Sequence, residues 1–208
     1  MVLYHDLGLI GYDEAYRCQQ KCVAKLSQGE EARVILCEHP PVLTLGRLSD
    51  RKNILVNEEE LRRRGVLVRS IDRGGDVTLH APGQLVVYPV IDLNQYGRDL
   101  HKHLHHLEEV AIALLDGFGI LGQRHPAQTG VWVKHKKIAS IGIGVRRWIT
   151  YHGLAINVNT DLSLFSLIRP CGLDVQMTSM AQEKMAPVEM AEVKEALKKH
   201  MKRVFEHE

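Results

Sequence analysis

Apolar residues recur at helical spacing in several parts of the chain. The clearest helix is predicted over residues 99–117, because its apolar positions lie three or four residues apart and form one face. That face comprises Leu100, Leu104, Leu107, Ala111, Leu114, Leu115 and Phe118. Residues 189–205 show the same spacing and predict a second amphipathic helix at the end of the chain.

Boundary residues predict two further helices nearer the N-terminus. Asp13 can cap a helix that runs through residues 15–28, and Gly29 can end it. Residues 58–64 predict a short helix that ends near Gly65.

Short apolar or alternating segments between these helices predict β-strands. Leu154, Ile156 and Val158 alternate with other residues, as in a strand with one buried face. The prolines of HPPVLTLGR keep residues 39–47 extended. The predicted strands cover residues 34–38, 66–72, 85–93, 129–135, 137–148 and 151–162. We therefore expect one α/β (α+β) domain over residues 1–208, with mixed, largely antiparallel sheets and flanking helices.

The composition is that of an ordinary globular chain. Of 208 residues, 45% are hydrophobic, and 27 Lys and Arg against 25 Asp and Glu give a formal net charge of +2. Aromatic residues make up only 5%, which argues against nucleic-acid binding by base stacking. No apolar run approaches the ~20 residues that span a bilayer, and the first residues do not resemble a signal peptide. We expect a cytoplasmic protein that binds neither membrane nor nucleic acid and whose four cysteines are free thiols.

Residues 73–84, with the sequence RGGDVTLHAPGQ, bring small, cationic and proton-transferring groups together. Two adjacent glycines allow a ligand or the backbone to approach closely. Arg73 offers several hydrogen-bond donors in a fixed fork, and His80 can donate, accept or carry a proton. The alternative is a glycine-rich connection between two strands. Because the segment leads into a predicted core strand, we interpret it as part of a ligand site.

Cys171 and Lys137 are the candidates for covalent chemistry. Cys171 lies between a proline that restricts the backbone and a glycine that opens space, so its thiol is more accessible than one in a strand. Its position alone leaves two alternatives open, an inert loop thiol and a nucleophile. A nucleophilic thiol must ionise, and its ordinary pKa of about 8.5 requires help from a nearby cation or base. Lys137 begins an apolar strand, so we expect a partly buried stem and a lowered pKa. The alternative for Lys137 is a solvated charge.

The histidine-rich segment HKHLHH raises the possibility of a zinc site. His101 and His105 are four residues apart on one face of the predicted helix, but the glutamate of an HExxH site is not at the required position. The glycine motif also lacks the GxxxxGK[ST] spacing of a phosphate-binding P-loop. We expect neither a metal nor a cofactor.

Taken together, several motifs resemble the lipoyl(octanoyl) transferases, which have the biotin/lipoyl protein ligase fold. They are RGGDVTLHAPGQLVVYP, GVWV followed by KKIASIGIGVRRW, YHGLAINVNTDL and RPCGLD, and HPPVLTLGR also fits. The resemblance runs from about residue 3 to residue 185 in the family's order and spacing. One departure is Leu79, where the family more often has an aromatic residue; we expect this to alter the wall of the acyl pocket.

The resemblance implies a biotin/lipoyl protein ligase-like catalytic domain that acts as an acyltransferase. The donor would be octanoyl-acyl carrier protein. The acceptors would be lysines in the lipoyl domains of 2-oxoacid dehydrogenase E2 subunits and in the glycine cleavage H protein. Cys171 would carry the octanoyl group as a thioester, and Lys137 would lower the pKa of that thiol. Nothing in the sequence demands more than a monomer.

The resemblance also implies a substrate site made of three segments. Its residues are Arg73, Gly74, Gly75, Asp76, Val77, Thr78, Leu79 and His80; Ser140, Ile141 and Gly142; and Gly153, Leu154 and Ala155.

Two other functions remain open at this point. An ATP-dependent lipoate or biotin ligase of the same fold needs no cysteine nucleophile, so the combination of RPCG with KIAS favours the transferase. A non-catalytic module that only binds acyl or lipoyl groups would acquire no acyl adduct on Cys171.

Overall fold

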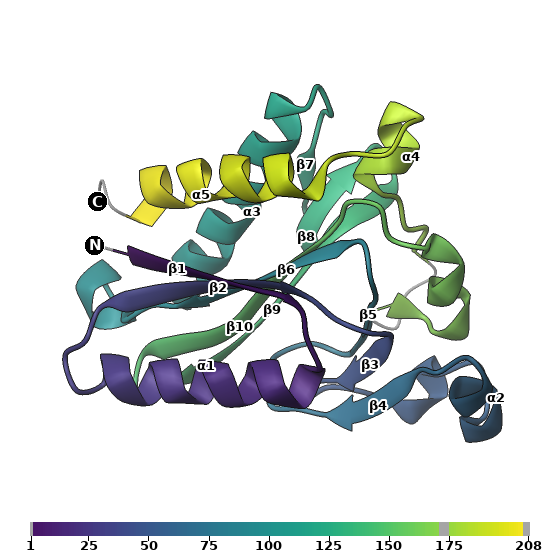
Figure 1. Ribbon diagram of the computed structural model, residues 1–208, viewed down its shortest axis with the longest axis horizontal. Coiled ribbons are helices and arrows are strands. Elements are labelled where there is room, and N and C mark those ends of the chain that lie inside the picture. The colour runs from purple at the N-terminus through teal and green to yellow at the C-terminus, as the bar shows by residue number, and fades with distance from the viewer. Residues whose placement is uncertain (1, 171–174, 206–208) are drawn as a thin grey trace.

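The computed structural model describes residues 2–170 and 175–205 (Figure 1). The strands are β1 (Val2–Leu9), β2 (Ala32–Glu38), β3 (Val42–Leu45), β4 (Leu67–Ser70), β5 (Val77–His80), β6 (Gln84–Val90), β7 (Gln123–His125), β8 (Gln128–Val133), β9 (Lys136–Arg146) and β10 (Ile149–Asn157). The α-helices are α1 (Tyr12–Leu26), α2 (Glu58–Arg63), α3 (Leu100–Gly117), α4 (Met180–Lys184) and α5 (Met190–Phe205). Short 3-10 helices are η1 (Arg51–Asn53), η2 (Leu93–Tyr96) and η3 (Leu162–Leu167).

The strands form one large and one small sheet. The large sheet has seven strands in the order β1-β2-β6-β10-β9-β8-β7, and the small sheet has three in the order β4-β3-β5. Within the large sheet β1 and β2 run parallel, whereas the other neighbouring strands run antiparallel. The small sheet pairs β3 parallel with β4 and antiparallel with β5. The mixed, largely antiparallel α/β fold predicted from the sequence is confirmed.

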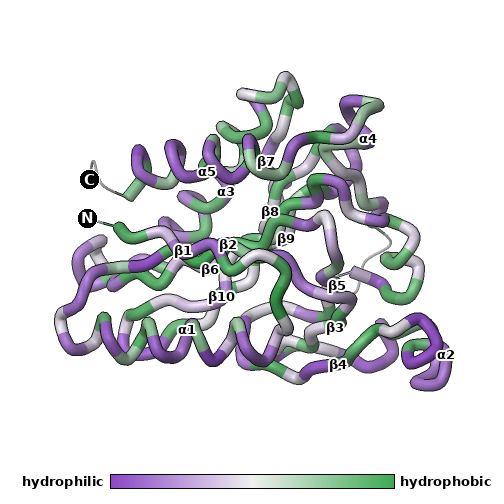
Figure 2. Tube along the Cα trace, in the orientation of Figure 1, coloured by the Kyte–Doolittle hydropathy of each residue, from purple (hydrophilic) through white to green (hydrophobic). Residues whose placement is uncertain are grey.

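Helices cover both faces of the large sheet. Figure 1 shows α1 along one face and α3 with α5 on the other. Successive residues of β2 point to opposite faces of the sheet and join two apolar cores. Ile35 packs in the core that contains Val23 of α1. Leu36 packs in the core that contains Leu107 of α3 and Leu197 of α5. Figure 2 shows hydrophilic and hydrophobic residues alternating along α1 and α5, as expected for helices with one buried face.

The predicted helices have boundaries that agree with the structure except at the start of α1, whereas α4 was not predicted from the sequence. Asp99 caps α3, and its side chain accepts a hydrogen bond from the backbone N–H of Lys102. The prediction of Asp13 as the cap of α1 is wrong, because Gly11 occupies the N-cap and Asp13 lies in the first turn. The Asp13 carboxylate instead accepts a hydrogen bond from Arg69 of β4 at 2.9 Å.

The apolar face of α3 also differs from the prediction at its first turn. Leu100 is 37% exposed, whereas His103 is only 2% exposed. The aromatic ring of Phe205, in α5, lies with its centroid 5.7 Å from that of His103 and accounts for this burial. His101 and His105 are exposed.

Several strand boundaries differ from the sequence prediction. The strand predicted over residues 85–93 is β6 and ends at Val90, because the Asp92 side chain caps η2. The strand predicted over 66–72 is the shorter β4. Three strands had no clear signal in the sequence: β1, β7, and β5, which lies inside the glycine motif.

Among the helices of the described residues, none combines the length and the apolarity that a membrane span requires.

Candidate active site

A cavity opens between the start of α1, strand β5 of the small sheet and strands β6, β9 and β10 of the large sheet. It contains about 510 Å³ of space, including its open mouth. Its lining residues are Tyr12, Ile71, Arg73, Gly75, Asp76, Val77, Thr78, His80, Val86, Tyr88, Ser140, Ile141, Gly142, His152, Gly153, Leu154 and Ala155. The three segments proposed from the sequence therefore meet here, although up to 82 positions separate Arg73 from Ala155 in the chain.

Strand pairing brings the second and third segments together. Ser140, Ile141 and Gly142 of β9 lie opposite Ala155, Leu154 and Gly153 of β10, respectively. One wall of the cavity is thus a two-stranded surface of small and apolar residues.

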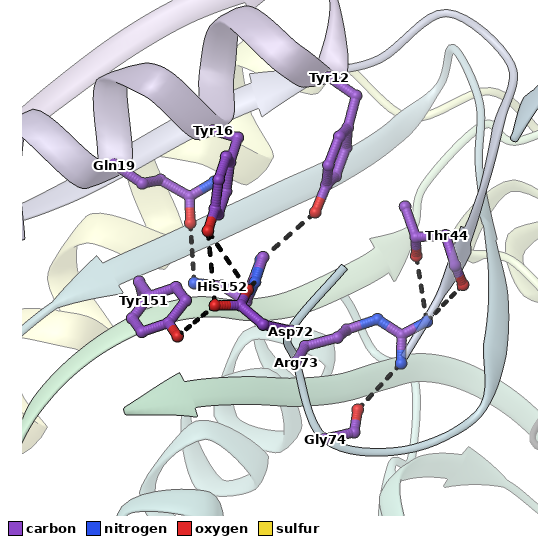
Figure 3. A network of polar contacts seen from close by, with 9 residues as sticks. All are labelled: Tyr12, Tyr16, Gln19, Thr44, Asp72, Arg73, Gly74, Tyr151 and His152. Carbon is purple, nitrogen blue, oxygen red and sulfur yellow. Dashed lines mark hydrogen bonds and ion pairs between the residues drawn. The ribbon is translucent and has the colours of Figure 1, made fainter. Parts of the chain in front are cut away.

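Arg73 lies in the glycine-rich loop and is anchored to the small sheet. Figure 3 shows its guanidinium between Thr44 of β3 and Gly74. One terminal nitrogen donates to the carbonyl and the hydroxyl of Thr44 at 2.7 and 3.0 Å, and the other donates to the Gly74 carbonyl at 2.9 Å. A Cβ on Gly142 would lie 3.0 Å from the Arg73 Cδ, so a glycine at this position lets the arginine pack against β9.

Three of the predicted site residues in the described part of the chain, Lys137, Leu79 and Gly74, are not among the residues that line the cavity. Leu79 is fully buried in the apolar cluster under the small sheet, with Leu43 and Phe165. The leucine that replaces an aromatic residue therefore does not form the cavity wall. Gly74 lies behind Arg73, where its N–H donates to the Ile143 carbonyl at 2.9 Å.

His80 is the titratable group at the end of β5. Its Nδ1 lies 2.7 Å from Gln84 Oε1, and its ring stacks on that of Tyr12 with centroids 6.3 Å apart. Burial, with a smaller effect from His39, lowers the pKa of His80 to about 3. The imidazole is therefore neutral near pH 7.

A second polar network at the cavity centres on Asp72 (Figure 3). The Asp72 carboxylate accepts hydrogen bonds from Tyr151 at 2.6 Å, from His152 Nε2 at 2.9 Å and from Tyr16 at 3.4 Å. Burial alone would raise the pKa of Asp72, but these hydrogen bonds hold it below its usual value. Because Nε2 of His152 donates to this carboxylate, Nδ1 faces the hydroxyl of Tyr12, 3.4 Å away.

Sequence reasoning missed the aromatic and polar members of this network. Asp72 directly precedes Arg73, and His152 directly precedes Gly153, so extending each motif by one residue would have found both. Tyr12 and Tyr16 come from α1, a helix with no functional signal in the sequence, and only the tertiary fold brings them to the cavity.

Lys137 is buried, with 3% of its surface exposed, and belongs to β9 three residues before Ser140. Its Nζ donates to the Thr129 carbonyl at 3.0 Å and lies 5.4 Å from the centre of the Trp132 ring. Its backbone N–H donates to Gln176 O at 2.8 Å, and its carbonyl accepts from Thr178 N at 2.9 Å. The segment after residue 174 therefore runs directly beside Lys137.

Gly130 makes the burial of Lys137 possible. Its φ of +129° is one that L-residues rarely adopt, and a Cβ there would lie 2.7 Å from the Lys137 Cε. The buried Glu108 of α3 fixes this position, because its carboxylate accepts from the Gly130 N–H at 3.0 Å.

Cys171 lies outside the described residues. The three cysteines that the structure describes, Cys18, Cys22 and Cys37, are free thiols and lie away from the cavity lining. Within residues 2–170 and 175–205, no cluster of three or more His, Cys, Asp or Glu side chains could hold a metal.

The arrangement suits the binding of an apolar chain beside polar groups. Val86, Ile141, Leu154 and Ala155 provide apolar walls, while Arg73, His80 and the Asp72 network provide hydrogen-bonding groups. Such a mixture is typical of small-ligand sites.

Comparisons with known proteins agree with this geometry. The family profile of the lipoyl protein ligase A/B catalytic domain matches residues 11–202. The octanoyltransferase of Geotalea uraniireducens is 49% identical over 191 residues, which cover 91% of this chain and 86% of that protein. The octanoyltransferase of Nitratidesulfovibrio vulgaris is 44% identical, with 97% of this chain and 94% of that protein covered.

Solved structures confirm the fold. Ta0514 from Thermoplasma acidophilum, a lipoate protein ligase homologue solved with bound lipoic acid, matches with a TM-score of 0.77 and 16% identity, over 98% of this chain and 86% of that one. The biotin protein ligase of Aquifex aeolicus with biotin and ATP matches with a TM-score of 0.60 and 13% identity, over 99% and 70% of the two chains.

The family resemblance of the sequence motifs is thus confirmed by relatives that align over most of their length. The chain belongs to the lipoyl protein ligase A/B catalytic domain family, within which it is an acyltransferase of the octanoyltransferase class.

Proposed function

We propose that the protein transfers an octanoyl group from octanoyl-acyl carrier protein to a lysine of a lipoyl domain, through a thioester on Cys171. The acceptors would be lipoyl domains of 2-oxoacid dehydrogenase E2 subunits and the glycine cleavage H protein. The observation that carries the proposal is the buried Lys137 on the strand that also forms a cavity wall.

Lys137 places an amine in a buried position next to two electron-rich groups. Its Nζ donates to the Thr129 carbonyl and lies over the Trp132 ring. Four residues separate Cys171 from Gln176, whose carbonyl bonds to the backbone of Lys137. This short connection supports a pairing in which Lys137 takes the proton of the Cys171 thiol.

The chemistry balances without ATP. The Cys171 thiolate attacks the carrier thioester, the new C–S bond forms as the old one breaks, and the carrier leaves as a free thiol. The acceptor amine then attacks the Cys171 thioester, so that a C–N bond replaces the C–S bond. One amine proton is released and one proton returns to the Cys171 sulfur through Lys137.

The cavity supports an acyl substrate. Each CH₂ group removed from water contributes about 0.8 kcal/mol, so an octanoyl chain gains several kcal/mol along the apolar wall of β9 and β10. Arg73 and His80 would then orient polar groups at the mouth of the site.

An ATP-dependent ligase is the rival function, because solved relatives of this fold include lipoate-protein ligase A bound with ATP. That likeness, at 14% identity, concerns the fold alone.

Intact-mass measurement with octanoyl-acyl carrier protein, in the absence of ATP, tests the proposal. We expect an octanoyl adduct on the wild-type protein and on Cys18→Ala, which alters a half-buried thiol outside the cavity. Cys171→Ala should form no adduct and transfer no octanoyl group. An active Cys171→Ala protein, or transfer that requires ATP, would overturn the proposal.

A further inference from the structure

Three buried polar side chains form a hydrogen-bonded chain from the cavity to the segment beside Lys137. His80 Nδ1 lies 2.7 Å from Gln84 Oε1, Gln84 Nε2 lies 2.9 Å from Asn157 Oδ1, and Asn157 Nδ2 lies 3.0 Å from the Thr178 carbonyl oxygen. His80, Gln84 and Asn157 are at most 7% exposed. The chain crosses from β5 through β6 and β10 to residues that follow Gln176.

Backbone carbonyls fix the direction of every hydrogen bond in this chain. The Thr178 carbonyl can only accept, so the Asn157 amide must turn its NH₂ group toward it and its oxygen toward Gln84. The Gln84 NH₂ group donates to that oxygen and also to the Leu79 carbonyl at 3.2 Å. The Gln84 oxygen therefore faces His80, and because it can only accept, Nδ1 of His80 carries the proton.

This tautomer leaves Nε2 of His80 with a lone pair. A neutral imidazole has one donor and one acceptor nitrogen, and burial keeps the ring neutral near pH 7. In the described part of the chain, the His80 ring makes its hydrogen bond through Nδ1 and none through Nε2, although His80 lines the cavity. The cavity wall thus includes a neutral nitrogen that can accept a hydrogen bond from a bound ligand.

We propose that Nε2 of His80 accepts a hydrogen bond from the acceptor amine during its attack on the acyl thioester, and that Gln84 and Asn157 are positioning residues that hold His80 in this tautomer. An octanoyl chain has no N–H or O–H group to donate, whereas an attacking amine keeps an N–H beside its lone pair. The hydrogen bond orients that lone pair toward the carbonyl carbon. This role rests on the proposed use of a lysine amine as acceptor.

The weak basicity of His80 limits it to orientation. The amine proton released on C–N bond formation goes to the leaving sulfur through Lys137, as in the proposed transfer, and His80 keeps its single proton on Nδ1. Asn157 also donates to the carbonyl of Thr178, and the backbone N–H of Thr178 donates to the Lys137 carbonyl. Gln84 is therefore the cleaner residue to change, because it contacts His80 without touching the Lys137 segment.

NMR of protein labelled with ¹⁵N-histidine tests the tautomer directly. We expect the His80 ring, assigned by the signals lost in His80→Asn, to be neutral with its proton on Nδ1 between pH 5 and 8. A proton on Nε2, or an imidazolium at neutral pH, would overturn the proposal. This measurement does not depend on activity, so a wrong tautomer of His80 can be distinguished from a failure of the proposed function.

Gln84→Glu tests the catalytic consequence. A carboxylate beside Nδ1 favours the imidazolium and raises the pKa of His80, which removes the acceptor lone pair at neutral pH. We expect transfer from preformed acyl-enzyme to a lipoyl domain to fall at least tenfold at pH 7. The loss should recover at higher pH, where the imidazole becomes neutral again, while acylation of Cys171 by the donor changes little.

Gln95→Glu is the matched control, because it adds the same charge at an exposed position of η2 outside the cavity. It should leave both half-reactions unchanged. If Gln84→Glu lowers the rates of both half-reactions equally and independently of pH, the hydrogen-bonded chain has only a structural role and the proposal fails.

Discussion

At the scale of the residue, the burial of Lys137 is the feature that most restricts the chemistry. A buried ammonium is costly unless hydrogen bonds and nearby electron-rich groups compensate it. The Thr129 carbonyl and the Trp132 ring contribute to that compensation, and Gly130 leaves the space that the side chain fills.

Lys137→Ala should retain the fold and slow octanoyl transfer by about 10²-fold or more, the usual contribution of a general base. Lys137→Arg should also be slow, since arginine keeps its proton. The pH dependence of Cys171 alkylation checks the cause, because loss of Lys137 should move the thiol pKa upward. Identical alkylation profiles in wild-type and Lys137→Ala proteins would contradict the role given to Lys137.

Gly130→Ala should reduce transfer because the new methyl group must displace both the Lys137 stem and the backbone carbonyl of Ala139. The positive φ adds a destabilisation of about 1 kcal/mol or more. Gly29→Ala is the control, since Gly29 also has a positive φ, of +92°, but a Cβ there meets nothing within 4 Å. Thermal unfolding should show a loss of stability in both variants, and only Gly130→Ala should lose activity at a temperature where both are folded. Equal activities would show that the space beside Lys137 is unimportant.

At the scale of the element, the local sequence pattern was sufficient to predict helices and strands whose hydrophobic periodicity extends over many residues. The helices α3 and α5 and the strand β9 lie within two residues of their predicted bounds, whereas β10 ends five residues before its predicted end. Strand β1 could not be predicted, because it exists through parallel pairing with β2, across the intervening α1. In the same way, the hydrogen bond between Asp72 and His152 joins residues 80 positions apart, so no local pattern encodes it.

His103 shows how tertiary packing overrides the pattern on α3. Neither of its ring nitrogens has a hydrogen-bond partner within residues 2–170 and 175–205, and Phe205 of α5 lies against it. Burial, reinforced by His106, lowers the pKa of His103 to about 4. A buried polar group without hydrogen-bond partners costs about 1–3 kcal/mol, so His103 lowers the free energy of unfolding.

His103→Leu should therefore raise the free energy of unfolding by about 1 kcal/mol at pH 7. It should also reduce acid sensitivity. Between an unfolded pKa of about 6.5 and the folded value, only the unfolded state binds the proton, so stability falls by about 1.4 kcal/mol per pH unit as the pH drops. The leucine removes this slope, which denaturant titrations from pH 7 to pH 4 would detect. His105→Leu, at an exposed position of the same helix, should leave the slope unchanged.

At the scale of the whole molecule, the cavity lies where three separate parts of the fold meet. Helix α1 supplies Tyr12, the small sheet supplies Thr78 and His80, and the large sheet supplies the β9–β10 wall. The small sheet has its own apolar cluster, so its packing and that of the large sheet are built from different residues. One opening between them would have to receive two protein-borne groups in turn, the acyl donor and the lysine acceptor.

The proposed thioester on Cys171 lets the protein keep the octanoyl group after the donor has gone, so we expect one partner to leave before the other binds. Initial rates measured against octanoyl-acyl carrier protein at several fixed lipoyl-domain concentrations should give parallel double-reciprocal lines, the signature of ping-pong transfer. Excess free acyl carrier protein should compete with the lipoyl domain for the acylated enzyme and slow the second step. Isolated acyl-enzyme, freed of carrier, should still octanoylate a lipoyl domain at the full rate. Intersecting lines, together with an acyl-enzyme that transfers only when carrier is added back, would instead require both proteins on the molecule together and a site that extends beyond this cavity.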